Sequence, residues 1–190
     1  IYTTIDSTLQ YNLQHSMDDY LGAIVVMERD TGRVLAMVSN PGYNPNLFEP
    51  VNYNSIMLQS ILNDPKLPLY NRAAQGVYPL GSVFKIITMA AALETGVFTP
   101  DYPYYCGNTW TELQGVTLYD WTYNRNLPAS GELTLQEGLM RSCNPWFWHI
   151  GYTLWNEGYT TAIADVAAGF GLGKKTGIEI TEFEGRLEQP

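Results

Sequence analysis

The feature that most constrains the fold is a helix predicted over residues 82–95, because its surface is apolar nearly all round. From Ser82 to Leu93 it reads SVFKIITMAAAL, and Lys85 is its single charge. A helix without a polar face has to be buried on most of its sides, so other elements must pack around it. Gly96 follows as a C-terminal cap, because glycine readily adopts the left-handed conformation in which helices end.

Lysine in the first turn of this helix is unfavourable for two reasons. It opposes the helix dipole, at a cost of roughly 0.3–1 kcal/mol, and burial penalises its charged form. Serine at position i and lysine at i+3 share one face of a helix, so the Lys85 amine can reach the Ser82 hydroxyl. A desolvated lysine has a depressed pKa and can accept a proton from serine. The alternative is that Ser82 caps the helix and Lys85 extends to water.

A second pattern, Ser142-Cys143-Asn144, lies at the junction of two predicted helices. Asn144 precedes Pro145, and asparagine in that position is a favoured N-cap. The functional interpretation is that Ser142 relays a proton and Asn144 binds a substrate carbonyl. Both interpretations can hold, because a junction between helices presents side chains rigidly.

A β-hairpin is predicted before these motifs, with strands at 23–28 and 33–39. Both strands are nearly continuously apolar, so we expect both faces to be covered. Two strands alone are marginally stable and leave two unpaired edges, so the hairpin requires further strands. A preceding helix is predicted over residues 7–20, where the apolar stripe consists of Leu9, Leu13 and Met17.

The remaining segments are read from their caps and composition. Residues 40–80 and 97–132 are predicted to be irregular. Helices are predicted over 134–141, 145–158 and 161–168. The first of them starts with a capping box formed by Thr134 and Glu137. A short strand is predicted over 178–180.

Composition excludes some functions. A net charge of −9 and a pI near 4.5 argue against nucleic-acid binding. The sequence shows neither an apolar run of roughly 18 residues nor a signal peptide. It starts with IYTTID, as if cut from something longer, so we expect any anchor or export signal upstream.

Metal and cofactor sites are not predicted. His15 and His149 have no ligands at suitable spacing and are interpreted as structural, and we expect no metal and no cofactor. Cys106 and Cys143 match no zinc pattern. The favoured interpretation is two free, mostly buried thiols, and a single disulfide remains the alternative.

S-x-x-K followed by S-x-N resembles the serine acyl-transferase pattern of penicillin-binding proteins and class A β-lactamases. The likeness covers essentially the whole chain, and the elongation-type class B penicillin-binding proteins match best. It rests on TTIDSTLQ (3–10), GAIVVMERDTGRVLAMVSNPGYNPN (22–46), NRAAQGVYPLGSVFK (71–85), LMRSCNPWFWHIG (139–151) and FGLGKKTGIEI (170–180).

The resemblance implies an α+β, penicillin-binding/serine β-lactamase-like fold that is partial here. Residues 1–190 would form part of a transpeptidase domain, with the helix and β-hairpin of the central sheet in 1–40, a loop approach in 41–81 and a mainly helical lobe in 82–190. Later sheet strands would come from missing residues or from another chain. The family's third motif, Lys-Thr/Ser-Gly, would lie far beyond the second one, so we expect Lys175-Thr176-Gly177 to be a separate structural segment, away from Ser82.

The activity implied is peptidoglycan D,D-transpeptidation. Ser82 would attack the D-Ala-D-Ala terminus of a stem peptide, with Lys85 as the base and Ser142 and Asn144 lining the site. β-Lactams would acylate the same serine, and this chain alone is expected to be inactive. The location implied is the periplasmic face of the bacterial inner membrane, an oxidising compartment that would permit a disulfide, and a glycan-polymerising membrane protein is the expected partner.

Two alternatives to a transpeptidase remain open. One is a serine β-lactamase, because residues 78–96 also resemble class D enzymes, although those enzymes carry S-x-V as their second motif. The other is a non-catalytic domain that senses β-lactams or acts as a scaffold.

Overall fold

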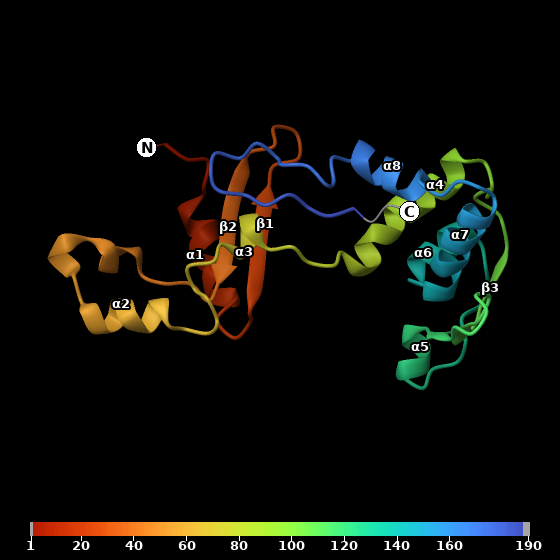
Figure 1. Cartoon of the computed structure of the whole chain (residues 1–190), viewed down its shortest axis with the longest axis horizontal. Helices are drawn as coiled ribbons and strands as arrows, with labels where there is room; N and C mark the ends of the chain where they lie inside the picture. Colours follow the sequence, from red (N-terminus) through yellow and green to blue (C-terminus); the bar gives the residue numbers. More distant parts are fainter. Residues whose placement is uncertain (1, 188–190) are drawn as a thin grey trace. The chain divides into compact units, whose positions relative to one another are not determined.

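The chain is described by a computed structural model that covers residues 2–187. The described residues form two compact units, one made of residues 2–77 and 175–184 and the other of residues 78–174 and 185–187. In the colour scheme of Figure 1 the first unit runs from red to yellow and includes a late blue segment. Within the described part of the chain, no helix is both long and apolar enough to cross a membrane. The subdivision at residues 40 and 81 stays a prediction.

The first unit is organised around an antiparallel hairpin of β1 (Gly22–Met27) and β2 (Val34–Asn40). These strands agree with the predicted ones to within a residue at each end. Helix α1 (Ser7–Ser16) packs against β2, and Figure 1 shows it alongside the hairpin. The predicted stripe of apolar side chains is half-buried, as expected for a helix with one face on a sheet.

The outer edge of β2 is covered by the segment around α1. The Gln10 side chain donates to Met37 O (2.9 Å) and accepts from Met37 N (2.8 Å), and Asp6 N donates to Leu35 O (2.9 Å). In the described residues no third strand joins the hairpin, and the outer edge of β1 is the one left for pairing. The expectation of two unpaired edges is therefore wrong, because side-chain and loop groups satisfy one of them.

The expectation that both faces of the hairpin are covered is also wrong for β1. Val25 and Met27 remain 47% and 62% exposed, whereas Ala36 and Val38 of β2 are fully buried. Within residues 2–187, α1 and α3 (Arg72–Gln75) pack against the hairpin, and they leave part of β1 open.

Residues 40–80 are less irregular than predicted. The structure forms two short 3-10 helices, η1 (Pro45–Phe48) and η2 (Pro50–Asn52), and a two-turn helix, α2 (Ser55–Leu62). The Asn54 side chain accepts a hydrogen bond from Met57 N and caps α2. The many proline and asparagine residues around it made the segment look irregular in the sequence, so this cap was not recognised. The strand predicted over 178–180 does not form, so that prediction is wrong.

The second unit is built around α4 (Lys85–Glu94), which packs against α7 (Asn144–Asn156) and α8 (Ala162–Gly169) (Figure 1). The predicted helix begins with a 3-10 turn, η3 (Gly81–Phe84), which continues into α4. One face of α4 lies in the core, but Val83 and Ile86 are 69% and 51% exposed. Burial on most sides is therefore wrong for the first turn and a half of this segment.

Residues 97–132, predicted to be irregular, contain two small sheets and a short helix. β3 (Tyr104–Cys106) pairs with β6 (Gly131–Leu133), β4 (Thr109–Trp110) pairs with β5 (Leu118–Tyr119), and α5 (Trp121–Asn124) follows β5. Strands of two or three residues leave too short an alternation to be read from sequence. The next helix, α6 (Leu135–Met140), begins with the predicted capping box, which is confirmed.

The core of this second unit is centred on Trp146, which is fully buried on α7. Its indole Nε1 donates to Leu133 O and Thr134 O at 3.2 Å each. The side chain thereby joins α7 to the end of β6 and the start of α6. This packing fixes the junction between α6 and α7, where the second motif lies.

Candidate active site

The four residues singled out from the sequence lie in η3, at the start of α4 and at the junction between α6 and α7. Ser82 is exposed in the 3-10 turn η3, and Lys85 opens α4 with 8% of its surface exposed. Ser142 follows α6 in a left-handed conformation (φ 51°), and Asn144 is the first residue of α7. A left-handed serine is uncommon, so the surrounding packing has to hold it.

A chain of hydrogen bonds links these side chains. Lys85 Nζ donates to Ser142 O (2.7 Å), Ser142 Oγ (3.1 Å) and Asn144 Oδ1 (2.6 Å). Ser142 Oγ in turn lies 2.9 Å from Ser82 Oγ and hydrogen-bonds to it. The amine therefore connects to Ser82 through Ser142, where the sequence had suggested a direct contact.

The capping alternatives for these residues are wrong. Ser82 caps neither η3 nor α4 with its side chain. Cys143, rather than Asn144, is the N-cap of α7, and its Sγ accepts from Trp146 N at 3.3 Å. The Asn144 carboxamide is therefore available to the lysine.

Burial determines the electrostatics of Lys85. Desolvation lowers its pKa from the ordinary value, and the negative charge of Asp120 partly offsets this by raising it. The amine also lies 5.3 Å from the centre of the Phe147 ring, a contact that favours the cation. Extension of Lys85 to water is ruled out by its burial, and the predicted direction of its pKa shift is confirmed.

The middle residue of the second motif is covalently anchored. Cys143 forms a disulfide with Cys106 at the end of β3, and both side chains are fully buried. The favoured interpretation of two free thiols is therefore wrong, whereas their burial is confirmed. The two cysteines are 37 residues apart, and only the fold brings them together.

Sequence reasoning missed Asp120, which is 1% exposed and lies directly before α5. Its Oδ1 accepts from Asn144 N (2.9 Å), and its Oδ2 accepts from Thr122 N (3.1 Å) and Thr122 Oγ1 (2.7 Å). An aspartate two residues before a threonine is a recognisable helix-start signal. That signal could have located the cap, but not its second contact with α7.

The string Lys175-Thr176-Gly177 lies in an irregular segment of the first unit. Thr176 N, Thr176 Oγ1 and Gly177 N all donate to the carboxylate of Glu182, at 2.7–2.9 Å. The backbone hydrogen bond from Thr176 is the main cause that lowers the pKa of Glu182. These donors are thus occupied by the chain's own carboxylate, and the separation of Lys175 from Ser82 stays a prediction.

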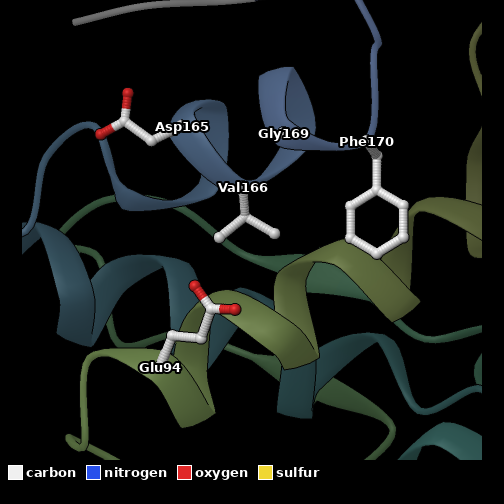
Figure 2. A pocket seen from close by; sticks show the side chains of 5 residues that line it. All are labelled: Glu94, Asp165, Val166, Gly169 and Phe170. Carbon is white, nitrogen blue, oxygen red and sulfur yellow. The ribbon is translucent and has the colours of Figure 1, made fainter.

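A separate surface pocket lies between α4 and α8 (Figure 2). It is lined by Glu94, Asp165, Val166, Gly169 and Phe170. Glu94 ends α4 whereas Lys85 begins it, so at 1.5 Å per residue this lining residue is about one helix length, roughly 14 Å, from the lysine. The pocket does not belong to the serine site. Among the described residues, no group of three or more His, Cys, Asp or Glu could hold a metal ion.

Comparisons with known proteins agree with this arrangement. Residues 22–188 match the family described as "Penicillin binding protein transpeptidase domain". The chain is 33% identical over 183 residues to the peptidoglycan D,D-transpeptidase MrdA of Escherichia coli, a match covering 96% of this chain and 28% of MrdA.

Two solved structures show the same fold. Pseudomonas aeruginosa PBP2, in complex with WCK 5153, matches with a TM-score of 0.83 and 29% identity, over 98% of this chain and 41% of that one. Penicillin-binding protein A from Mycobacterium tuberculosis, as its penicillin G acyl-enzyme, matches with a TM-score of 0.77 and 31% identity, over 95% and 42% respectively.

The chain thus spans less than half the length of these relatives. The predicted α+β fold, present in part, is confirmed by these matches. The chain therefore belongs to the penicillin-binding protein transpeptidase family, and within it to the class B, elongation-type members.

Proposed function

We propose that the complete protein is a peptidoglycan D,D-transpeptidase in which Ser82 is the nucleophile. The observation that carries this proposal is the hydrogen-bond chain from an exposed serine through Ser142 to a buried lysine. A nucleophile needs a base within hydrogen-bond reach or one relay away, and a third group that orients the base. Asn144 is that third group.

The contacts of Lys85 indicate how it would accept a proton. Ser142 O and Asn144 Oδ1 are carbonyl oxygens, which can only accept hydrogen bonds. A neutral amine therefore has its two N–H bonds directed to them, and its lone pair faces Ser142 Oγ. Both hydroxyls can rotate, so Ser82 can donate to Ser142 while Ser142 donates to the amine. The proton of Ser82 would thus reach Lys85 through Ser142.

The reaction follows from this path. Ser82 Oγ attacks the carbonyl carbon of the penultimate D-alanine as its proton moves through Ser142 to Lys85. The bond to the terminal D-alanine nitrogen then breaks, and a proton passes from Lys85 through Ser142 to the leaving amine. The amino group of a second stem peptide would then attack the acyl carbon, and its proton would pass through Lys85 and Ser142 to Ser82 Oγ as the ester bond breaks. A β-lactam would acylate Ser82 by the same steps, with its ring amide in place of the peptide bond.

The test is acylation of the complete protein by a fluorescent penicillin, followed by mass spectrometry of the labelled peptide. We expect a stable adduct on Ser82, complete loss of it in Ser82→Ala, and unchanged labelling in Ser60→Ala, an exposed serine on α2. Labelling that persists in Ser82→Ala would refute the proposal.

Two further measurements separate the alternative functions. Rapid hydrolysis of the β-lactam, in place of a stable adduct, would identify a serine β-lactamase. A stable adduct without cross-linking of a stem-peptide analogue would identify a sensing or scaffolding protein. A transpeptidase gives both a stable adduct and cross-linked product.

Location and partners belong to the same proposal. The resemblance supports placement at the periplasmic face of the inner membrane, with an anchor outside residues 1–190 and a glycan-polymerising partner. The buried Cys106–Cys143 disulfide is compatible with that oxidising compartment. Alkaline phosphatase fused after residue 190 should therefore be active in cells, whereas a cytoplasmic reporter fused there should not.

A further inference from the structure

The catalytic steps above leave the buried carboxylate of Asp120 without a role. Asp120 and Lys85 are the charged side chains buried in the second unit, within the part of the chain that the structure describes. A buried carboxylate is costly unless hydrogen bonds satisfy it. Capping the single turn of α5 uses only Oδ2, through Thr122. The other oxygen reaches across to α7, so capping does not account for the whole arrangement.

The contact with α7 falls on the residue that holds the lysine. Asp120 Oδ1 accepts from Asn144 N at 2.9 Å, and Asn144 Oδ1 accepts from Lys85 Nζ at 2.6 Å. One residue therefore bridges the carboxylate and the amine, which bond lengths place within about 10 Å of each other. A negative charge at the first N–H of a 13-residue helix is also favourable.

The other charged groups on the surrounding elements are directed elsewhere. Glu137 closes the capping box of α6, and His149 pairs with Glu112. The charged residues that remain on or next to α4, α5, α6, α7 and α8 are exposed. They are Glu94 at the end of α4, Arg125 after α5 and over the Trp121 ring, Arg141 after α6, Glu157 after α7, and Asp165 on α8. Asp120 is the charge that acts on the Lys85 amine.

We propose that Asp120 is a positioning residue for acylation, whose carboxylate fixes Asn144 and whose negative charge acts on the Lys85 amine across that bridge. This inference rests on the proposed function of Ser82 and Lys85. It assigns two separable effects to one side chain: the position of Asn144, and the balance between the charged and neutral forms of the amine.

The test compares Asp120→Asn with Thr122→Val in the complete protein, by the rate of acylation with a fluorescent penicillin between pH 5 and about pH 10. Loss of the negative charge disfavours the ammonium form of Lys85. The pH midpoint of the acylation rate in Asp120→Asn should therefore move down by about 1 pH unit. This magnitude is the Coulomb energy of two charges about 10 Å apart at an effective dielectric constant of about 20. The plateau rate also falls, by about tenfold or more, because Asn144 is less firmly held. Thr122→Val removes the hydroxyl that donates to Asp120 Oδ2 and keeps the charge of Asp120, so the midpoint of its rate stays at the wild-type pH.

Asp120→Glu serves as the second variant, because it keeps the charge and displaces the carboxylate. We expect a wild-type midpoint with a reduced plateau rate. An Asp120→Asn midpoint equal to that of the wild type, or an equal shift in Thr122→Val, would overturn the inference.

A readout that does not depend on acylation separates this inference from the proposed function. With ¹³Cε-labelled lysine, the Lys85 signal is assigned by its loss in Lys85→Arg and then titrated by NMR. The Asp120→Asn titration should move to lower pH even if wild-type protein proved not to be acylated at Ser82. An unchanged titration refutes the role of Asp120, whereas an unlabelled Ser82 refutes only the proposed function.

Discussion

The disulfide next to the second motif yields a quantitative prediction. Replacement of both cysteines, as Cys106→Ala with Cys143→Ser, opens a loop closed across 37 residues. The chain-entropy treatment of such a loop gives about 4 kcal/mol of lost stability. The sulfur atoms lie in the fully buried core around Trp146, so the loss should lower the stability of the whole second unit.

Hydrogen-exchange mass spectrometry of the complete protein measures the effect locally. A loss of about 4 kcal/mol corresponds to roughly 10³-fold faster exchange of α7 amides that exchange by opening of the unit. Peptides from α1, in the other unit, should be unaffected and serve as the internal control. Wild-type protein treated with a thiol reductant should approach the exchange of the double variant.

The choice of residue at position 143 refines this prediction. Cys143 caps α7, and a serine oxygen there can still accept from Trp146 N, whereas alanine cannot. The variant with Cys143→Ala should therefore lose about 1 kcal/mol more than the variant with Cys143→Ser. If exchange in α7 rose less than about tenfold in both variants, the disulfide would not be a main constraint on the second motif.

Two more predictions follow from buried groups. In Gly138→Ala the new Cβ would lie 2.3 Å from Trp146 Cδ1 on a fully buried ring, so we expect a loss of about 1–3 kcal/mol in urea unfolding. A Cβ added at Gly151, on α7, would meet no atom within 4 Å beyond its chain neighbours and the backbone of its own helix, so Gly151→Ala should be neutral or stabilising. Equal losses in both variants would contradict the packing argument. Burial lowers the pKa of Lys85 in the folded protein. Between that pKa and the ordinary lysine value, the unfolded chain therefore binds more protons than the folded one. The free energy of unfolding of the wild type, relative to that of Lys85→Met, should rise with pH over this range. Urea midpoints measured at several pH values check this, and a difference that did not change with pH would show that the amine is not desolvated.

Local sequence determined the features that depend on neighbours a few residues apart. The i, i+3 spacing of Ser82 and Lys85, the capping box at Thr134 and the two nearly continuous apolar runs of the hairpin were all readable from the sequence. The two motifs also led to the family, which the comparisons then showed. Each of these signals lies within one helix turn, one strand or one short motif, so no tertiary contact is needed to recognise it.

Only the tertiary structure decided the features that join distant segments. The Cys106–Cys143 bond, the contact of Asp120 with Asn144 and the covering of β2 by Gln10 connect residues 24–37 positions apart. Such pairings depend on how helices and strands pack, and no local spacing encodes them. The hydrogen-bond chain from Lys85 through Ser142 to Ser82 arises in the same way, because it joins the start of α4 to the left-handed residue between α6 and α7. The two motifs therefore predicted which residues come together in the candidate site, and packing decided which of them touch.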